Sequence, residues 1–374
     1  MVIFGNIAYY GQERANIELF KTLSDKVEPI FLTNHKWGHL HIHPVLDEFG
    51  FKWEKMKYVF PFRKDDNIRT WLYNLYYLCS SNLSLIRFLK KYKTSYIHIG
   101  NDFFFMTLIP VLIFARTPII FYIVDRPIQH FSIYKFLWKK IIGKKVSFFA
   151  CISDYIKNEL LKLKVQIDKI DVVYTVIPER NEILPEVMIE IKQTFKIDYF
   201  GQITEIKGIG LLIEAFLNLC KKYDDLQLLI AGSLHFTNVY ANKMLEYVKM
   251  IKYENKILFL DYVENIPDLL QKSNLHIAPS IKEEPLGIVV LEAKKSNIPS
   301  IIFNSGGLTE MVEHKVDGYI CYEKSSNEIE KAVEFFYNLP DKGKIFGDNA
   351  KKSLEKLPFN IEQFKQKWIK IYDL

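Results

Sequence analysis

With 374 residues, 49% of them hydrophobic and 25% charged, the chain is long enough for two globular domains and too apolar to be intrinsically disordered. Its net charge of +6 is uneven, because residues 1–185 carry 26 Lys and Arg against 17 Asp and Glu, whereas the remainder carries 24 against 27. The basic first half has a net charge of +9 and favours an anionic partner, such as a membrane surface, a phosphorylated acceptor or a nucleic acid.

Cysteine spacing and the first residues bear on the cellular compartment. The four cysteines are scattered without a C-x-x-C pair: Cys79, Cys151, Cys220 and Cys321. A zinc ribbon or a disulfide framework is therefore disfavoured, and a reducing cytosol is favoured. The chain start lacks the basic and apolar segments of a signal peptide, and the longest apolar run, 103–115, is too short to span a bilayer. We expect a cytoplasmic protein, with the inner face of the cell membrane as a further expected location.

The first half predicts a parallel sheet. Residues 2–5 and 27–33 read as strands and residues 12–23 as a helix between them, which is a βαβ unit. Residues 66–93 have a helical period and predict two helices broken near Ser80–Asn82. Further strands are expected at 95–99, 118–124 and 146–152, with Asp102 and Ser153 as caps of the helices that follow.

Strand 118–124 delivers two charged residues to the carboxyl edge of this sheet, where α/β proteins place their sites. These are Asp125 and Arg126. Asp125 reads equally well as a site residue and as a helix cap or an ion-pair partner of Arg126.

Two other stretches of the first half have open interpretations. His35, His39, His41 and His43 alternate in a way that could ligate a metal, but solvated or core histidines are the more usual case, so we expect an acceptor-side loop and no metal. Residues 131–145 mix aromatic and lysine side chains, which fits either a helix on an anionic membrane or an ordinary amphipathic helix with a solvated lysine face. No nucleic-acid-binding fingerprint is present, so no nucleic acid partner is expected.

The second half alternates strands and helices again. Strands are expected at 195–203, 227–231, 257–260, 275–280 and 299–303, and helices at 209–222, 239–252, 267–273, 288–295 and 359–372. This pattern predicts a second parallel-sheet domain, so the fold class is α/β. We expect the domains at residues 1–178 and 179–356, followed by a last helical segment at 357–374.

The most informative stretch runs from Glu284 to Glu292, as E-P-L-G-x-x-x-x-E-A. It joins a buried strand to a helix that opens beside Gly287, and the free N–H groups of a first helical turn attract anions. The two glutamates lie about 12 Å apart at 1.5 Å per helical residue. Backbone amides suit phosphates and the acids suit hydroxyls, so the layout fits a sugar nucleotide. An ordinary capped helix with acidic residues near its start would explain the same sequence pattern without a ligand.

This stretch resembles the signature of retaining glycosyltransferases of family 4. The resemblance covers residues 195–321 well and residues 1–178 loosely. It implies the GT-B fold, in which two Rossmann-like parallel-sheet domains face each other across a cleft and the last helix crosses back to the first domain. In the family, the acid matching Glu284 contacts the donor sugar and the acid matching Glu292 contacts the ribose.

A second motif of the family departs from its pattern here. Gly201-Gln202-x4-Lys207-Gly208 resembles the family's Gly-Arg-x4-Lys-Gly, in which Arg and Lys hold the donor diphosphate. Lys207 fits that role. Gln202 can donate a hydrogen bond but carries no charge, which puts catalysis in more doubt than donor binding.

The remaining site residues are carried over from the same resemblance. The pair Gly306-Gly307 resembles the family's donor loop and is expected to open a helix whose start adds a second anion site. Tyr262 and Val263 match the loop that reads the base. Asp125 stands where the family often has a histidine beside the donor sugar. The expected catalytic residues are Glu284, Lys207 and Asp125; the expected donor-binding residues are Gln202, Lys207, Tyr262, Val263, Glu284, Leu286, Gly287, Ile288, Glu292, Gly306 and Gly307; and the expected acceptor-side residues are Gly11, Arg14 and Arg126.

The resemblance implies metal-independent transfer of a sugar, with retention, from a UDP- or GDP-sugar to a hydroxyl of a glycan or lipid-linked acceptor. No cofactor is expected, and peripheral association with an anionic membrane is an expected partner interaction. Three alternatives stay open: a non-catalytic nucleotide-sugar-binding protein, which Gln202 favours; a nucleotide-sugar epimerase of the same architecture; and a peripheral membrane or nucleic-acid-binding protein that uses the basic half.

Overall fold

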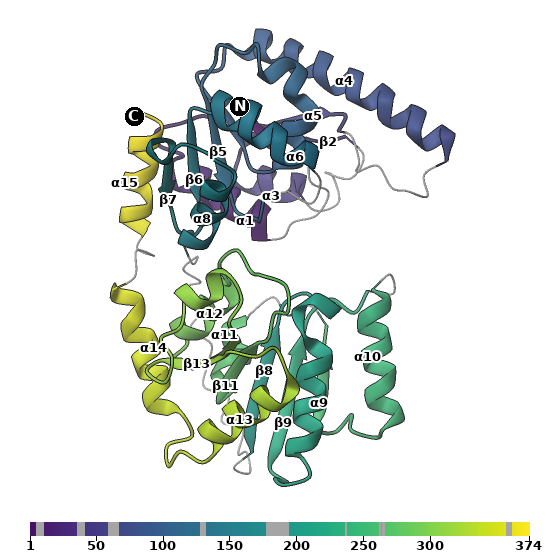
Figure 1. Cartoon of the computed structure of the whole chain (residues 1–374), viewed down its shortest axis with the longest axis vertical. Helices are drawn as coiled ribbons and strands as arrows, with labels where there is room; N and C mark the ends of the chain where they lie inside the picture. The colour runs from purple at the N-terminus through teal and green to yellow at the C-terminus, as the bar shows by residue number, and fades with distance from the viewer. Residues whose placement is uncertain are drawn as a thin grey trace. The chain divides into compact units, whose positions relative to one another are not determined.

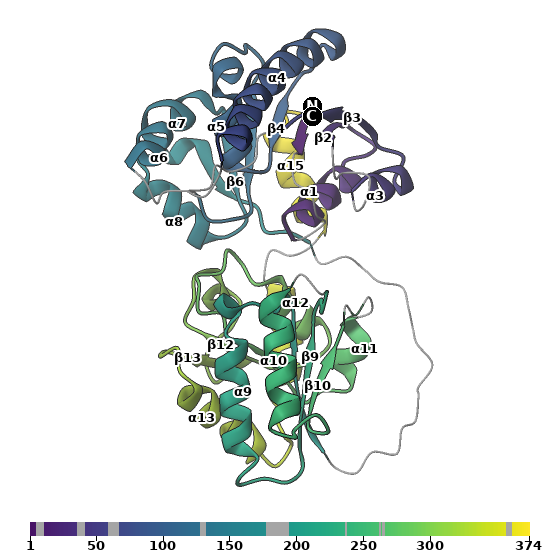
Figure 2. The ribbon, with the colours of Figure 1, turned by 90° about the vertical axis from the view of Figure 1, so that its right-hand side faces the viewer.

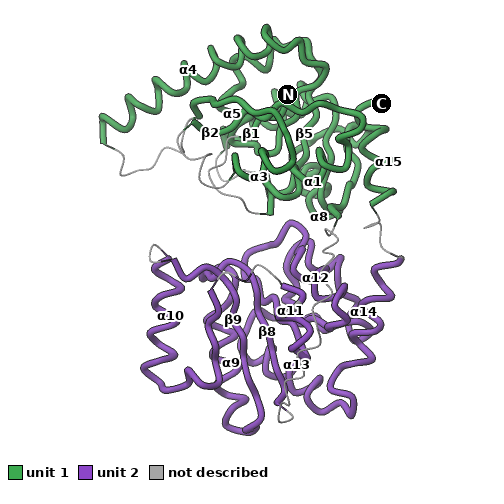
Figure 3. The backbone as a smooth tube through the Cα atoms, turned by 180° about the vertical axis from the view of Figure 1, so that it is seen from behind, with its two compact units in different colours: residues 1–176, 359–374 green, residues 177–358 purple. Residues whose placement is uncertain are grey.

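The structure, a computed structural model, describes residues 1–4, 11–35, 42–58, 67–127, 132–176, 194–235, 238–261, 263, 266–356 and 361–374. The chain divides into two compact units (Figure 3). Unit 1 comprises Met1–Val176 together with Phe359–Leu374, and unit 2 comprises Ile177–Pro358. None of the described helices is both long and apolar enough to cross a membrane.

Unit 1 is built on a parallel sheet, as the βαβ pattern predicted. Seven strands of its described residues pair in the order β3-β2-β1-β4-β5-β6-β7. Their bounds are β1 (Val2–Phe4), β2 (Ile30–Asn34), β3 (Lys52–Met56), β4 (Ile97–Ile99), β5 (Ile119–Ile123), β6 (Phe148–Cys151) and β7 (Ile170–Val172).

Helices cover both faces of this sheet (Figure 1). They are α1 (Gly11–Thr22), α3 (His43–Glu48), α4 (Ile68–Tyr92), α5 (Asp102–Leu112), α6 (Ser132–Leu137), α7 (Gly143–Lys145), α8 (Asp154–Lys162) and α15 (Ile361–Ile371), with a π-helix at Trp138–Ile142 and a 3₁₀ turn at Ile167–Lys169. Consecutive residues of β5 mark the two faces. Phe121 packs against Phe105 of α5 at 6.1 Å between ring centroids, and Tyr122 packs against Trp368 of α15 at 5.0 Å.

Helix α15 therefore belongs to the core of unit 1, although it is the last helix of the chain. The buried His98 of β4 links it to the sheet: its Nδ1 lies 2.6 Å from the hydroxyl of Tyr372, and its Nε2 lies 2.7 Å from Oδ1 of Asn16 in α1. Burial lowers the pKa of His98 to about 3. The imidazole is thus neutral in the folded protein, with one nitrogen donating and the other accepting.

Two local predictions for unit 1 are wrong. The break near Ser80–Asn82 does not occur, because α4 is one helix of 25 residues. Ser84 and Asn82 donate to the carbonyls of Ser80 and Leu78, so these polar side chains satisfy themselves along the helix instead of ending it. Helix α5 is capped by Asn101, whose side chain accepts from Phe103 N, and Asp102 is its first residue. Ser153 caps α8, as expected.

Unit 2 repeats the layout with a parallel sheet of six strands among its described residues, in the order β10-β9-β8-β11-β12-β13. The strands are β8 (Phe195–Phe200), β9 (Leu226–Ala231), β10 (Ile257–Leu260), β11 (Leu275–Ala278), β12 (Ser300–Phe303) and β13 (Gly318–Cys321). The helices are α9 (Ile209–Leu219), α10 (Val239–Met250), α11 (Ile266–Gln271), α12 (Ile288–Lys295), α13 (Ser326–Tyr337) and α14 (Lys344–Lys356), with 3₁₀ turns at Glu205–Lys207 and Gly307–Glu310.

Two apolar layers fill unit 2. Side chains of α9, α10 and α13 pack against one face of the sheet, and side chains of α11 and α12 pack against the other (Figure 2). The helix expected after Gly306 is only a four-residue 3₁₀ turn that ends at the buried Met311. Of the two helix starts expected at the site, α12 is therefore the one that continues as an α-helix.

Candidate active site

The order of strands in unit 2 gathers four loops at one edge. Parallel strands β8, β11, β12 and β13 are neighbours, so the loops that follow them leave the sheet side by side at its carboxyl edge. These loops hold Lys207 after β8, Glu284 after β11, Gly306 after β12 and Lys324 after β13. Residues that are up to 117 positions apart in the sequence are thus placed within reach of one another.

Lys207 and Glu284 form an ion pair between the first two of these loops. The ammonium of Lys207 contacts Oε1 of Glu284, and the same oxygen accepts a hydrogen bond of 2.6 Å from the hydroxyl of Ser280. The side chains are 26% and 16% exposed, so the two opposite charges are partly shielded from water while staying open to a ligand. Two residues that the sequence assigned to the donor are therefore in direct contact.

Glycines bring the loops closer than any side chain would permit. Gly208 has φ +78°, and a Cβ there would lie 2.0 Å from the carbonyl oxygen of Pro279. Gly287 has φ +93°, and a Cβ there would lie 2.3 Å from Leu308. A Cβ on Gly307 would lie 2.2 Å from the carbonyl oxygen of Pro285. Gly208 and Gly287 are required by a left-handed backbone conformation, and Gly208 and Gly307 are also required because a Cβ there would clash with a backbone oxygen.

Backbone hydrogen bonds fix the same loops. Gly307 N donates to the carbonyl of Glu284 at 2.7 Å, and Glu284 forms an isolated parallel bridge with Gly306. Ile281 N donates to the carbonyl of Ile206 at 2.9 Å, beside Lys207. The backbone of Glu284 is therefore anchored on one side to the Gly306-Gly307 loop and on the other to the Lys207 loop.

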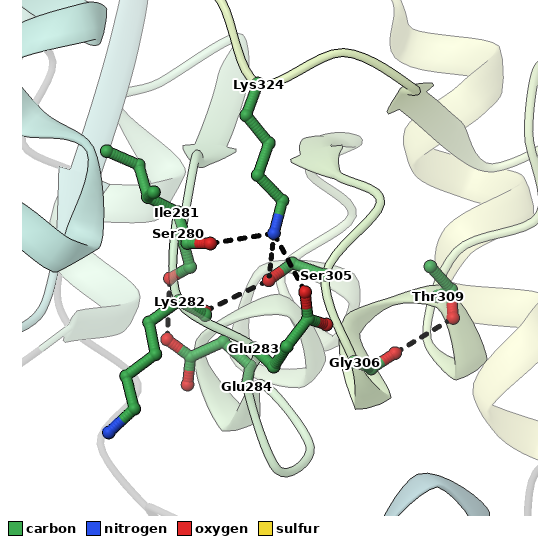
Figure 4. A network of polar contacts seen from close by, with 9 residues as sticks. All are labelled: Ser280, Ile281, Lys282, Glu283, Glu284, Ser305, Gly306, Thr309 and Lys324. Atoms are coloured by element: carbon green, nitrogen blue, oxygen red, sulfur yellow. Dashed lines mark hydrogen bonds and ion pairs between the residues drawn. The ribbon is translucent and has the colours of Figure 1, made fainter.

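Lys324 completes the cluster and was missed by the sequence analysis (Figure 4). Its ammonium donates to the carbonyl of Ile281 at 2.7 Å, to Oε1 of Glu283 at 2.9 Å and to the hydroxyl of Ser305 at 3.4 Å. The Ser305 hydroxyl in turn donates to the carbonyl of Lys282 at 3.0 Å. The three donors of one lysine thus tie the loops after β11, β12 and β13 together.

The start of α12 has the features expected of an anion site. Gly287 precedes the helix, and no side chain caps its first amides. Leu286 is buried, and Ile288, the first helical residue, is half-buried. Glu292 is half-buried in the second turn of α12. Its assignment to the ribose stays a prediction.

The remaining donor-side residues lie apart from this contact network. Gln202 is exposed, and its carbonyl accepts a hydrogen bond of 2.6 Å from the hydroxyl of Tyr199. Burial raises the pKa of Tyr199, and the charge of Glu284 raises it further. Val263 packs against the apolar layer around Phe200. Tyr262 lies outside the described residues.

Unit 1 has its own pocket at the carboxyl edge of its sheet, with a volume of about 130 Å³. Gln12, Asn101, Asp125 and Arg126 are among its lining residues. Asp125 is exposed and accepts from the backbone N of Arg126 at 2.7 Å. The expected acceptor-side residue Arg126 thus lines a cavity together with Asp125.

The guanidinium of Arg126 is held by a buried acid. Its Nε donates to Oε2 of Glu159 at 2.8 Å, and Lys162 donates to the other oxygen at 2.6 Å. Burial alone would raise the pKa of Glu159, but Lys162 and Arg126 outweigh it, so the net pKa is lowered. A charged Glu159 therefore orients Arg126 toward the pocket edge.

Gly11 and Arg14 lie in the first turn of α1, after residues outside the described part of the chain. Gly11 is exposed, and a Cβ there would meet no atom within 4 Å. Close packing within unit 1 therefore does not demand glycine at this position. Arg14 is half-buried.

The histidine-rich stretch is only partly described. His43 hydrogen-bonds to the hydroxyl of Thr33 at 2.8 Å and stacks on Trp53 with 3.8 Å between ring centroids. His39 and His41 lie outside the described residues. In the part of the chain that the structure describes, no three His, Cys, Asp or Glu side chains gather as metal ligands would.

Comparison with known sequences places residues 184–353 within a match to the family described as glycosyl transferases group 1. An uncharacterized glycosyltransferase of Haemophilus influenzae is 26% identical over 189 residues, which are 50% of this chain and 52% of that protein. The N-acetyl-alpha-D-glucosaminyl L-malate synthase of Bacillus anthracis is 27% identical over 179 residues, 46% of this chain and 45% of that protein. The chain thus spans about half the length of the curated relatives it matches.

Solved structures resemble the whole chain. HepE of Anabaena in complex with UDP superimposes with a TM-score of 0.79 at 17% identity, covering 100% of this chain and 99% of that one. Sucrose-phosphate synthase from Thermosynechococcus elongatus gives 0.77 at 15% identity, covering 100% and 98%. At these identities the likeness shows the fold alone, and it confirms the expected architecture of two Rossmann-like parallel-sheet domains.

Proposed function

We propose, from the match of residues 184–353 to the family of glycosyl transferases group 1, that the chain is a retaining glycosyltransferase. Its donor is a nucleoside-diphosphate sugar and its acceptor is a hydroxyl of a glycan or a lipid-linked glycan. The observation that carries the proposal is the Lys207–Glu284 ion pair, set among the glycine loops and the uncapped start of α12.

Each part of this cluster suits one part of the donor. Lys207 and the first amides of α12 offer positive charge and N–H donors to a diphosphate. The carboxylate of Glu284 accepts hydrogen bonds from sugar hydroxyls. Glu292, in the second turn of α12, is the acid for the ribose. Gly287 and Gly307 keep side chains away from the backbone that a phosphate would approach.

The ion pair sets up an exchange of partners on donor binding. Without ligand, Lys207 is neutralised by Glu284. A diphosphate competes for the ammonium, and the sugar hydroxyls then replace the ammonium at the carboxylate. The lysine is thus held in position beforehand, so little side-chain entropy remains to be lost when the donor arrives.

In the proposed reaction, the bond between the anomeric carbon and the phosphate oxygen breaks while the acceptor hydroxyl attacks from the same face. The acceptor proton passes to the departing phosphate oxygen. Lys207 stabilises the charge that develops on the diphosphate, which is the kind of preorganised electrostatic help that contributes most to such steps. The reaction so written needs no metal, no cofactor and no protein nucleophile.

The acceptor is assigned to the unit 1 edge. Asp125 and Arg126 line its pocket with Gln12, and Gly11 and Arg14 lie in the adjacent first turn of α1. A carboxylate and a guanidinium suit hydroxyl and phosphate groups of a glycan acceptor. The donor base is proposed as uridine or guanosine; HepE, which shares the fold, is named in complex with UDP and with UDP-glucose.

Ligand binding and product analysis test the proposal in sequence. A thermal-shift panel of UDP- and GDP-sugars is expected to raise the melting temperature with at least one donor, because a ligand that binds only the folded state stabilises it. Glu292→Ala is expected to weaken nucleotide binding, and Glu284→Ala to lower turnover more than binding. The anomeric configuration of the product, measured by NMR with EDTA present, then tests retention and metal independence together. No stabilisation by any nucleotide sugar would contradict the proposal.

Gln202 favours a second candidate, a nucleotide-sugar-binding protein without transferase activity. The residue is exposed and uncharged at the position where the family supplies an arginine. Gln202→Arg separates the two: a gain in turnover from near zero supports the binding protein, and little change supports the native enzyme. An assay for conversion of the donor without acceptor separates both from an epimerase.

A further inference from the structure

Helix α4 exposes its apolar side to water. Ile68, Leu72, Leu75, Leu83 and Ile86 are 37–78% exposed. Their spacing of four, three, eight and three residues places them on one face of the helix. Burial of such side chains stabilises a protein, so exposing five of them forgoes part of that gain.

The opposite side of α4 carries polar residues, although it is the side that faces the protein. Asn74, Ser81 and Asn82 are buried there with Leu85. Asn82 donates to the carbonyl of Thr107 in α5 at 2.9 Å, so part of the packing between α4 and α5 is a hydrogen bond rather than apolar contact. Tyr77, Leu78 and Phe88 are half-buried on this side, so α4 carries apolar residues on both faces, which a surface helix that serves only its own core does not need.

Aromatic side chains surround the first turns of the same helix. Trp71, Tyr73 and Tyr76 are 50–54% exposed. Figures 1 and 3 show this end of α4 extending beyond the other helices of unit 1. Trp and Tyr are the residues that concentrate at the boundary between lipid headgroups and acyl chains.

The charge of α4 has one sign. Its 25 residues include no Asp or Glu, while Arg69, Arg87 and Lys90 are exposed. Lys57, which precedes the helix, lies 4.7 Å from the ring centroid of Tyr76 and donates to its hydroxyl. Cations beside an apolar stripe complement an anionic lipid surface.

We propose that α4 is the membrane-binding element of this protein, lying in the plane of an anionic bilayer with its apolar stripe among the acyl chains. The sequence had indicated residues 131–145 for such contact. There, however, Trp138 and Ile142 are buried, and the exposed large apolar residues are only Ile133 and Phe136 among the described residues. The stripe on α4 is longer, with five such residues on one face.

The placement of α4 suits a membrane-held acceptor. The helix follows β3 in a parallel sheet, so its first residue lies toward the carboxyl edge, which is also the edge of the pocket lined by Asp125. This consequence rests on the proposed function. The binding itself does not, because it is measured with no sugar nucleotide present.

Vesicle cosedimentation tests the proposal. The full chain is expected to bind vesicles that mix phosphatidylcholine with phosphatidylglycerol, to bind phosphatidylcholine vesicles weakly, and to lose affinity as salt rises. The variant Leu72→Glu/Leu75→Glu is expected to bind at least about tenfold more weakly. Both positions are exposed, so the fold should be kept, which circular dichroism checks. The matched control is Val239→Glu/Met250→Glu, which adds two acids at exposed apolar positions of α10 in unit 2.

Trp71 supplies an independent readout. Brominated lipid in the anionic vesicles is expected to quench tryptophan fluorescence of the wild-type chain and to quench Trp71→Phe less. Equal vesicle binding by the α4 and α10 variants would overturn the proposal. So would a wild-type dimer, seen by sedimentation velocity, that the α4 variant dissociates while neither binds vesicles; the stripe would then belong to a second copy of the chain.

Discussion

The two units share a parallel-sheet layout, yet the carboxyl edges of their sheets differ in kind. In unit 2 the edge is crowded: Lys207, Glu284 and Lys324 have charged or polar partners in neighbouring loops, and glycines permit backbone contacts closer than a Cβ would allow. Among the described residues of unit 1, Asp125 is exposed beside a small pocket, and a Cβ on Gly11 would meet no atom within 4 Å.

This difference explains why the family motifs are recognisable in the sequence of unit 2 and only loosely matched in that of unit 1. Where loops touch, few residue types fit, so the pattern of glycines and charges is constrained. Where side chains are exposed and have few close neighbours, many residue types fit and the sequence can vary. The family match accordingly covers residues 184–353, which fall wholly within unit 2. Four changes test the contrast.

The largest effect is expected from Lys207→Met. Loss of the ammonium that faces the leaving diphosphate should lower turnover by about 10²–10³-fold, by analogy with removal of single oxyanion donors. Asp125→Asn, at an exposed position of unit 1, should lower turnover by less than about tenfold. Steady-state kinetics with the donor found by thermal shift measures both.

A matched control comes from the same site. Lys282 is exposed, and Figure 4 shows its ammonium pointing away from the network, so Lys282→Met should leave turnover nearly unchanged. Similar losses for Lys207→Met and Asp125→Asn would remove the distinction between the two edges.

The next effect concerns the glycines. Gly208→Ala should lower the free energy of unfolding by about 3 kcal/mol, because φ is +78° and the new Cβ would lie 2.0 Å from a backbone oxygen. Gly11→Ala should change it by less than about 0.5 kcal/mol. Denaturant titration followed by circular dichroism compares them, and equal stabilities would show that the Gly208 loop can relax.

A third effect belongs to unit 1. The folded-state pKa of His98 is about 3 against an ordinary 6.5, so the unfolded chain binds more protons between these values. Stability should therefore be fully present above pH 6.5 and fall by about 2 kcal/mol by pH 5. All five tryptophans, at 37, 53, 71, 138 and 368, lie within the residue ranges of unit 1, so tryptophan fluorescence reports its unfolding.

The variant His98→Gln should remove the part of this pH dependence that His98 contributes, while the Met1 ammonium, whose pKa burial lowers to about 5, keeps its own part in both chains. His235→Gln, at an exposed histidine of unit 2, serves as the control and should leave the slope intact. A slope as steep in His98→Gln as in the wild-type chain would place its origin in other groups.

The smallest effect is expected from Lys324→Met. It would leave Glu283 without this partner and loosen the three loops, so nucleotide affinity should fall about tenfold, or ~1.4 kcal/mol, while stability changes by less than ~1 kcal/mol. Calorimetric titration measures the affinity, again with Lys282→Met as control. A loss of stability without a loss of affinity would make Lys324 a purely structural residue.

Much of the fold follows from the sequence, because buried parallel strands and amphipathic helices have separate periods. The errors have local causes. At Ser80–Asn82, polar side chains bond back along α4, which a count of helix-breaking residues does not register. After Gly306, paired glycines produced a 3₁₀ turn where a longer helix was expected.

The site was predictable to the extent that it uses motif residues close together in sequence. Glu284 and Gly287 share one motif, and the contact with Lys207 confirms that the two motifs meet. Lys324 belongs to no motif. Only the position of β13 beside β12 reveals that its loop reaches Ser305 and Glu283, so the order of strands was the missing signal.

Helix α15 has a consequence for how the chain is made. A ribosome releases every residue of unit 2 before it releases Trp368 and Tyr372, whose rings cover Tyr122 and His98 in unit 1. Translation therefore completes the second unit while the first still lacks one wall of its interior. Truncation of the chain before Trp368 is therefore expected to leave the core of unit 1 incomplete, even though the rest of unit 1 and all of unit 2 have been synthesised.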